Sequence, residues 1–292
     1  MDRDLSTADV GVALVEIVTR ALYEDLAVGD VTSRCVVPRD RRSRARIIAR
    51  EEVVMAGGGV VREVFRQVDP DVAVTLDFAD GASVPAGARV ARLEGRSRSL
   101  LAGERTALNL LQRACGIATM TRGFVARVEG ASDRCKITDT RKTMPGLRAL
   151  DRHAVRCGGG VNHRNDLGAG VLIKENHIRA AGGVRAAVSA ARATAPHTLR
   201  ICCEVATLEE LDEALSAGAD AVLLDNMDDG GVAEAVRRVA GRAVVEVSGG
   251  VELGRVEALA RLGVDRISVG RLTHSVRAPD LSLLFDEDAA LS

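Results

Sequence analysis

The sequence predicts an α/β protein in which an N-terminal α+β sandwich domain is followed by an incomplete α/β barrel of six or seven strands. From Lys136 onward, short apolar runs alternate with longer helical patterns, as they do in successive βα units of a parallel sheet. The predicted strands end near residues 141, 174, 204, 225, 248 and 270. Such regular spacing favours a barrel over a doubly wound open sheet, which is the competing architecture.

The first half of the chain has a mixed texture, with Gly and Pro turns between its segments. The helical patterns cover 10–26, 60–68 and 100–128, and the strand-like segments cover 43–50, 51–57, 71–78 and 88–95. We predict an N-terminal α/β-sandwich domain over residues 1–115, which a returning C-terminal segment, 276–292, would join. The barrel domain is predicted over residues 116–275.

The second half supplies six apolar runs with helical stretches between them. The runs are CKITDT, GVLIKE, LRICCEV, DAVLLD, AVVEVS and DRISVG, and the helical stretches are GLRALDRHAVRC, VRAAVSAARATA, LEELDEALSAG, GVAEAVRRVAG and LGRVEALARLG. Several of these stretches end at Gly, as a helix C-cap does. The pattern therefore predicts six βα units.

Composition excludes several classes of function. The 292 residues carry 40 basic and 41 acidic side chains, with aromatics at 2% and no Trp, so a nucleic-acid partner is not expected. The first thirty residues contain neither a signal peptide pattern nor an apolar run of spanning length, which predicts a cytoplasmic protein without a membrane partner. The six cysteines lack C-x-x-C spacing, and we expect them to be reduced and mostly buried.

Polar residues and glycines stand at the predicted carboxyl ends of all six strands, where barrels carry their chemistry. In order along the chain they are Asp139, Thr140, Arg141 and Lys142; Lys174, Glu175 and Asn176; Glu204; Asp225 and Asn226; Ser248, Gly249 and Gly250; and Gly270 before Arg271. His163 and Arg164 follow a triple glycine between the first two strands. We expect these residues to converge on one site.

The residue types point to an anionic ligand. Arg141, Lys142, His163, Arg164 and Lys174 form a local excess of cations in a chain whose net charge is −1. The Ser-Gly-Gly turn resembles a phosphate-binding loop, and two acids on neighbouring strands suit hydrated Mg²⁺ or ribose hydroxyls. Taken singly, each residue also has an ordinary explanation as a solvated charge, a helix cap or a turn glycine. Their joint occurrence favours a ligand, because buried strand ends rarely keep charges without a partner.

Eight motifs together resemble the quinolinate phosphoribosyltransferase family over nearly the whole chain. They are EDLxxGDVTS (24–33), GERTALNLLQRxxGIAT (103–119), DTRKTxPGLR (139–148), AVRCGGGxNHR (154–164), LIKENHI (172–178), LLDN (223–226), VSGG (247–250) and ISVGRLTHS (267–275). The third and fourth motifs are highly specific, whereas LLDN and SGG alone would mean little.

The resemblance implies a homodimer whose active sites are completed across the interface, with a higher oligomer also open. It implies that quinolinate and 5-phosphoribosyl 1-pyrophosphate, with Mg²⁺, give nicotinate mononucleotide, pyrophosphate and CO₂. By similarity, catalysis and substrate binding are assigned to these residues: Arg105 from the partner subunit; Arg141, Arg164 and Lys174, with His163, around quinolinate; Lys142 toward pyrophosphate; Glu204 and Asp225 at ribose and metal, through water; Ser248, Gly249, Gly250 and Gly270 around the 5-phosphate; and Thr140, Val269 and Arg271 as further substrate-binding residues.

The chain departs from the family pattern at three neighbours of these residues, where it has Ala169, Cys202 and Ala206 in place of frequent acids. Metal affinity or substrate fine-tuning could differ as a result. Three alternative functions stay open at this point. They are a related phosphoribosyltransferase for another aromatic acid, a phosphosugar isomerase or lyase on a barrel, and a non-catalytic sensor of phosphorylated metabolites.

Overall fold

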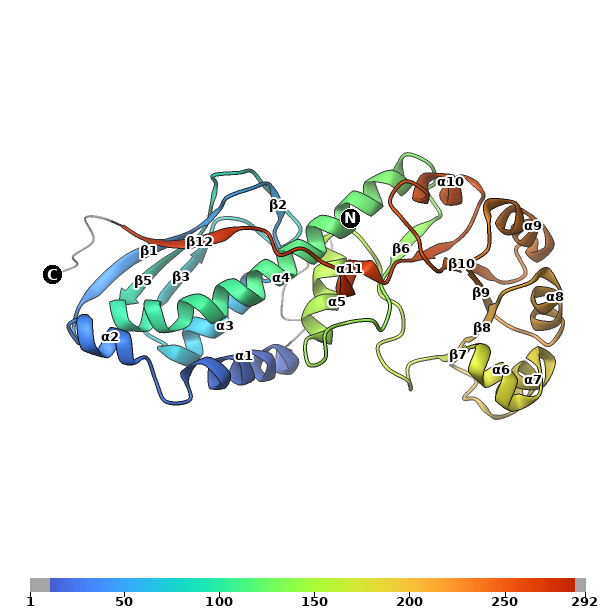
Figure 1. The fold of residues 1–292 in the computed structure, drawn as a ribbon, viewed down its shortest axis with the longest axis horizontal. Helices are drawn as coiled ribbons and strands as arrows, with labels where there is room; N and C mark the ends of the chain where they lie inside the picture. Colours follow the sequence, from blue (N-terminus) through green and yellow to red (C-terminus); the bar gives the residue numbers. More distant parts are fainter. Residues whose placement is uncertain (1–10, 287–292) are drawn as a thin grey trace. The chain divides into compact units, whose positions relative to one another are not determined.

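The computed structural model describes residues 11–286 and divides the chain into two compact units (Figure 1). Unit 1 comprises the chain up to Arg122, the segment Thr143–Gly159 and the chain from Leu272; unit 2 comprises Gly123–Lys142 and Gly160–Arg271. This division differs from the domain limits predicted from the sequence mainly at Thr143–Gly159, and those limits stay a prediction. Residues 287–292 of the predicted returning segment lie outside the described residues.

Unit 1 is built on a four-stranded antiparallel sheet in the order β12-β1-β5-β3. Its strands are β1 (Arg42–Ala49), β3 (Ala73–Leu76), β5 (Arg89–Arg96) and β12 (Leu281–Phe285), and a separate pair is formed by β2 (Val53–Val54) and β4 (Ser83–Val84). Its helices are α1 (Gly11–Leu26), α2 (Val31–Val36), α3 (Gly58–Val68), α4 (Ser97–Glu129, which runs on into unit 2), α5 (Arg148–Cys157) and α11 (Arg271–His274). Strand β12 pairs with β1 from Ala45↔Phe285 to Ala49↔Leu281, so the end of the chain completes this sheet.

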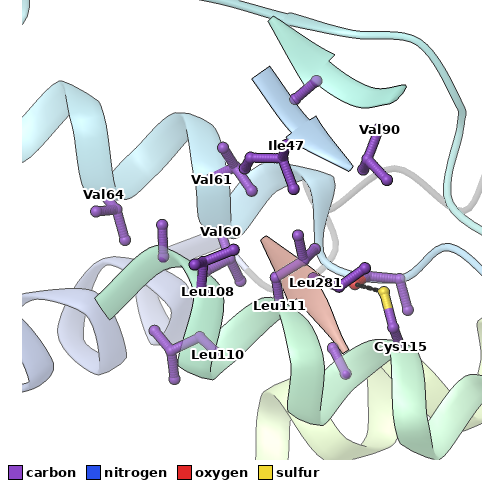
Figure 2. Packing of buried hydrophobic residues seen from close by; sticks show 14 of the residues in the cluster. Ile47, Val60, Val61, Val64, Val90, Leu108, Leu110, Leu111, Cys115 and Leu281 are labelled. Atoms are coloured by element: carbon purple, nitrogen blue, oxygen red, sulfur yellow. Dashed lines mark hydrogen bonds between the residues drawn. The ribbon is translucent and has the colours of Figure 1, made fainter. Parts of the chain in front are cut away.

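The core of unit 1 lies between this sheet and the helices α3 and α4 (Figure 2). Helix α3 buries Val60, Val61, Val64 and Phe65 because these positions recur at helical spacing on one face. The ring of Phe65 packs directly over Gly103 of α4, where a Cβ atom would come within 2.6 Å of it. Helix α5 contributes to the same core, which explains why its segment belongs to unit 1.

Unit 2 contains one six-stranded parallel sheet in the order β6-β11-β10-β9-β8-β7. Its strands are β6 (Lys136–Thr138), β7 (Val171–Ile173), β8 (Ile201–Val205), β9 (Ala221–Asp225), β10 (Val244–Ser248) and β11 (Arg266–Ser268). Its helices are α6 (Glu175–Ala181), α7 (Val184–Thr194), α8 (Leu208–Ser216), α9 (Asp229–Val239) and α10 (Val256–Arg261).

The strand order confirms the predicted incomplete barrel and excludes a doubly wound sheet. Each strand from β7 to β11 lies beside its sequence neighbour, and the last strand, β11, returns to pair with the first, β6. This is the cyclic order of a barrel. Within the described residues no ladder joins β6 to β7, so the sheet is open between these two strands.

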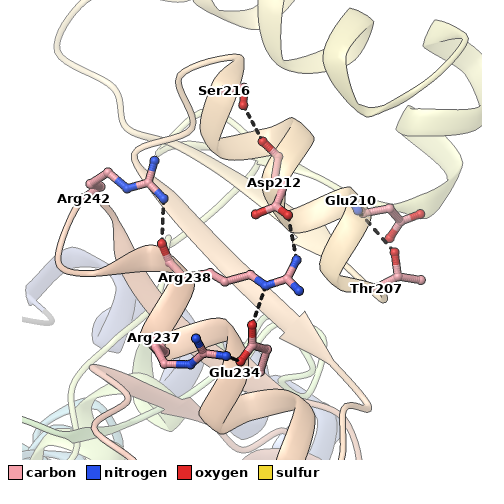
Figure 3. Close-up of polar contacts among 8 residues, drawn as sticks. All are labelled: Thr207, Glu210, Asp212, Ser216, Glu234, Arg237, Arg238 and Arg242. Atoms are coloured by element: carbon pink, nitrogen blue, oxygen red, sulfur yellow. Dashed lines mark hydrogen bonds and ion pairs between the residues drawn. The ribbon is translucent and has the colours of Figure 1, made fainter.

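Helices α7 to α9 pack on one face of the sheet, where they cover apolar side chains such as Cys203, Val222 and Val245. Charged side chains tie neighbouring helices together at the surface of unit 2 (Figure 3). Arg238 of α9 donates to Glu234 on its own helix and to Asp212 of α8, both at 2.7 Å. The opposite face carries polar strand residues such as Glu204 and Glu246 beside apolar ones such as Leu223. None of the helices described between residues 11 and 286 is long and apolar enough to cross a membrane.

Candidate active site

The carboxyl ends of the six parallel strands lie at one edge of the unit 2 sheet. Glu204 of β8 lies opposite Leu223 of β9, and Ser248 of β10 lies opposite Asp225 of β9. Leu223 and Asp225 are two residues apart on one strand, so their side chains, and those of their partners, point to the same face. Glu204, Asp225 and Ser248 therefore share the face that lies opposite the helices α7 to α9. Lys174 reaches the same group, because its Nζ lies 2.7 Å from Glu204 Oε2.

Arg141 and Arg164 come close together from two different loops. Burial lowers the pKa of the Arg164 guanidinium, and the neighbouring positive charge of Arg141 lowers it further. The Nη1 atom of Arg164 donates to Gly170 O at 2.8 Å, but the Nε atoms of both arginines are buried without a hydrogen-bond partner. Two adjacent guanidinium groups with buried, unsatisfied donors are suited to an anion that accepts from both.

The loop that carries His163 and Arg164 is fixed by a buried carboxylate at the end of β6. Asp139 is fully buried and accepts from His163 N at 2.6 Å and from Asn162 Nδ2 at 2.7 Å. Its own N–H donates to Val161 O at 3.2 Å. The sequence singled out Asp139 as a strand-end residue but did not assign it this role.

Lys142 and Thr140 lie in the turn that follows β6. The Lys142 side chain is exposed, and its backbone N–H donates to Thr140 Oγ1 at 3.1 Å. Thr140 therefore shapes the turn that presents the two consecutive cations. Arg105, which the resemblance assigns to a neighbouring subunit's site, lies exposed on α4 in unit 1.

The turn after β10 requires glycine for a steric reason. Gly249 has a φ of +91°, and a Cβ atom there would lie 2.8 Å from Asn226 N and closer still to the Asn226 side chain. Asn226 itself has a φ of 54° and donates from N to Ser248 O at 3.1 Å. The ends of β9 and β10 are thus locked together, whereas Gly250 meets nothing within 4 Å of its ideal Cβ.

Val269 and Gly270 follow β11, the last strand of the parallel sheet. Val269 is buried, and its N–H already donates to Thr138 O at 2.9 Å. Gly270 is half-buried, and Arg271 is exposed at the start of α11. The predicted substrate-binding residues therefore include one, Val269, whose backbone N–H already donates to another strand.

Sequence reasoning missed one buried acid on the site face, Glu246 in the middle of β10. Its Oε1 atom accepts a hydrogen bond from Ser268 Oγ and lies 3.5 Å from His163 Nε2. The available signal was a glutamate inside the apolar run AVVEVS, where a buried strand would otherwise place an apolar residue.

Unit 1 contains a separate cluster of possible metal ligands, Asp80, His153 and Cys157. His153 Nε2 lies 2.7 Å from Asp80 Oδ2, and Asp80 also accepts from Gly57 N and Gly58 N at the start of α3. A metal-bound imidazole normally donates its second N–H to an acceptor, yet His153 Nδ1 is buried without one. The geometry therefore fits a structural role in which Asp80, in the turn between β3 and β4, links α5 to the start of α3.

Comparison with known proteins adds family relationships to this geometry. Residues 117–284 match the family described as quinolinate phosphoribosyl transferase, C-terminal domain, and residues 30–115 match the corresponding N-terminal domain. The probable nicotinate-nucleotide pyrophosphorylase [carboxylating] of Bacillus subtilis is 40% identical over 92% of each chain. The nicotinate-nucleotide pyrophosphorylase [carboxylating] of Mycobacterium leprae is 43% identical over 91% of this chain and 95% of the relative.

Solved structures of similar proteins have the same fold as this chain. The nicotinate-nucleotide pyrophosphorylase from Francisella tularensis superposes with a TM-score of 0.89 at 40% identity, covering 94% of this chain and 96% of that one. NadC from Streptococcus pyogenes superposes with a TM-score of 0.89 at 36% identity, covering 98% of this chain and all of that one.

Proposed function

The chain belongs to the quinolinate phosphoribosyltransferase family, and from this premise we propose that it transfers the phosphoribosyl group of 5-phosphoribosyl 1-pyrophosphate to quinolinate. The products are nicotinate mononucleotide, pyrophosphate and CO₂. The protein is thus a decarboxylating pentosyltransferase of de novo NAD synthesis.

The single observation that carries the proposal is the pair Arg141 and Arg164. Of the four buried side-chain nitrogen or oxygen atoms without a hydrogen-bond partner in the described part of the chain, two are the Nε atoms of these residues. A third, Thr138 Oγ1, lies at the end of β6, three residues before Arg141. A ligand with two adjacent carboxylates would satisfy buried cationic donors that come from two loops, which supports quinolinate as the acceptor.

The chemistry needs charge stabilisation and positioning more than a nucleophile. The pyridine nitrogen of quinolinate bonds to ribose C1 while the bond from C1 to the pyrophosphate oxygen breaks, and the electron pair leaves with pyrophosphate. Cations such as Lys142 lower this barrier by stabilising the leaving group. The bond from C2 to its carboxyl group then breaks, CO₂ departs, and the ring carbon keeps the electron pair beside the cationic nitrogen until it takes a proton from solvent.

Mg²⁺ is proposed as the cofactor, with Glu204 and Asp225 as the residues that would hold it. Each carboxylate keeps one oxygen engaged by the protein, Glu204 with Lys174 Nζ and Asp225 with Asn226 Nδ2 at 2.8 Å. Mg²⁺ usually takes one or two carboxylates, several waters and substrate phosphates, and this donor set fits that pattern. When bound, the ion would neutralise charge on the pyrophosphate.

A homodimer with shared active sites is also proposed. Six of the nine large hydrophobic residues that are exposed in the described part of the chain lie on or beside α1 and α2: Val12, Val15, Tyr23, Val28, Val31 and Val36. Apolar side chains gathered in this way mark interaction surfaces. Arg105 is exposed on α4 and available to a neighbouring subunit. Cytoplasmic location stays a prediction from the sequence.

The test is incubation with 5-phosphoribosyl 1-pyrophosphate, Mg²⁺ and either quinolinate or nicotinate, with mononucleotide, pyrophosphate and CO₂ measured together. We expect the three products in equal amounts from quinolinate and none from nicotinate. Turnover of nicotinate instead would favour a phosphoribosyltransferase for another aromatic acid. Tight binding of 5-phosphoribosyl 1-pyrophosphate without any pyrophosphate release would favour a sensor.

A further inference from the structure

Glu246 is a buried carboxylate on the face of the sheet that carries the proposed site. Glu246 lies in the middle of β10, between valines, and only 6% of the residue is exposed. A carboxylate in such a place is costly unless protein groups compensate for its lost hydration. Ser268 Oγ donates to its Oε1 atom, and His163 Nε2 lies 3.5 Å from the same oxygen.

The imidazole of His163 has a protein group at each nitrogen. Nδ1 accepts a hydrogen bond from the backbone N–H of Arg164 at 2.7 Å. A nitrogen that accepts carries no proton, so the hydrogen-bond network assigns the ring proton to Nε2, which faces Glu246. His163 therefore connects the Glu246 carboxylate to the backbone of Arg164.

Arg164 needs such support because its surroundings do not favour a cation. Its guanidinium is partly buried beside Arg141, and both burial and the like charge lower its pKa. The bond from Nη1 to Gly170 O holds one end of the side chain. The backbone N–H of Arg164 donates to the ring of His163, and the backbone N–H of His163 in turn donates to Asp139.

We propose that Glu246 is a positioning residue of the dicarboxylate-binding site and that it acts through His163 to hold Arg164 in place. The inference rests on the proposed function, because Arg164 is taken to contact quinolinate. It goes further by giving a role to Glu246, which the family resemblance does not assign to the site. It also gives His163 the task of orienting Arg164, with its ring proton directed at Glu246.

The test is a double-mutant cycle between Glu246→Leu and His163→Ala, with KM for each substrate as the readout. Glu246→Leu removes the acceptor, and we expect KM for quinolinate to rise roughly tenfold while KM for 5-phosphoribosyl 1-pyrophosphate changes by less than about twofold. Glu246→Gln keeps an acceptor oxygen and should restore most of the affinity. In the His163→Ala background, Glu246→Leu should have almost no further effect. Glu257→Gln, on the exposed side of α10, is the matched control and should match wild type.

Additive effects in the cycle, or an equal rise of both KM values, would overturn the proposal, since Glu246 would then act independently of His163 or on the whole sheet. If the Leu variant does not fold, Glu246→Asp decides the matter. The shorter aspartate side chain would place its carboxylate farther from His163 Nε2 and should raise KM for quinolinate about threefold. An unchanged KM would refute the idea. Wild-type enzyme that makes no product from quinolinate would instead refute the proposed function.

Discussion

Arg141 and Arg164 show how much of the site depends on single side chains. Both arginines were proposed as substrate-binding residues from the sequence, because strand ends and cation-rich loops are visible in the order of the residues. Glu246 was not predicted, because a buried acid within an apolar run becomes meaningful only when folding brings it beside His163 and Ser268. The pattern of strands in the sequence does not show which residues that are distant in the sequence will be in contact.

Replacement of Arg141 by Ala should weaken both quinolinate binding and turnover. Each charge-assisted hydrogen bond contributes roughly 1.5 to 3 kcal/mol, so kcat/KM should fall by about 10- to 150-fold or more. Steady-state kinetics with both substrates measures the change. The matched control is Arg261→Ala, an exposed arginine of α10 that forms an ion pair with Glu257 and should leave kcat/KM unchanged. Normal kinetics for the Arg141 variant would remove this residue from the site.

At the scale of elements, the long periodic segments were predicted well. All six parallel strands lie where the apolar runs predicted them, and the helical patterns at 10–26 and 100–128 correspond to α1 and α4. Three short helices, α2, α6 and α11, were not predicted, because four to seven residues give too little periodicity. The segment 51–57 was predicted as a strand but pairs only at Val53 and Val54.

The turn after β10 provides a steric test. Gly249→Ala should destabilise the fold and raise KM for 5-phosphoribosyl 1-pyrophosphate, because its Cβ would collide with Asn226. Gly250→Ala also places a side chain at positive φ but meets open space, so its cost should stay near 1–2 kcal/mol. Thermal unfolding and kinetics of the two variants compare collision with conformational strain. Equal effects would mean that the contact with Asn226 does not matter.

Asp69, at the C-terminal end of α3, makes stability depend on pH. Burial alone would raise the pKa of this carboxyl, but hydrogen bonds from Ser99 Oγ and Asp71 N, with the charges of Arg96 and Arg42, outweigh burial and lower the pKa. A depressed folded-state pKa stabilises the protein above the unfolded value near pH 4, and this contribution is lost as the pH falls through the folded value.

Asp69→Asn should therefore cost about 1–2 kcal/mol of unfolding free energy at pH 7, and the difference from wild type should shrink as the pH falls through the lowered pKa of Asp69 in the folded protein. Urea unfolding at several pH values measures it. Asp25→Asn, at an exposed position of α1, is the control and should have little effect at any pH. A difference for Asp69→Asn that does not change with pH would contradict the assignment.

At the scale of the whole molecule, the sequence predicted the incomplete barrel, and the strand order β6-β11-β10-β9-β8-β7 confirms it. What the sequence pattern alone did not predict is that the segment of α5, which lies between the first two barrel strands, packs with unit 1. The sequence of α5 has an apolar face like that of a barrel helix, and it does not show which core this face packs against. In the structure the apolar face of α5 packs into the core of unit 1.

Shared active sites in a homodimer can be tested by mixing two variants that are each strongly impaired. Arg105→Ala and Arg141→Ala should each impair both sites of their own dimer, whereas a hybrid dimer should keep one intact site. After subunit exchange at equal amounts, activity should recover to about a quarter of wild type, since half the dimers are hybrids with one working site of two. Each variant incubated alone is the control. Absence of recovery in dimers proven to be hybrids would contradict shared sites.

The central claim is that the two half-buried arginines, Arg141 and Arg164, bind a dicarboxylate together. Calorimetric titration of quinolinate and nicotinate into wild type and Arg164→Ala tests it most directly. Wild type should bind quinolinate about tenfold more tightly than nicotinate, and Arg164→Ala should remove most of this preference. A preference that is equally large in Arg164→Ala would contradict the account.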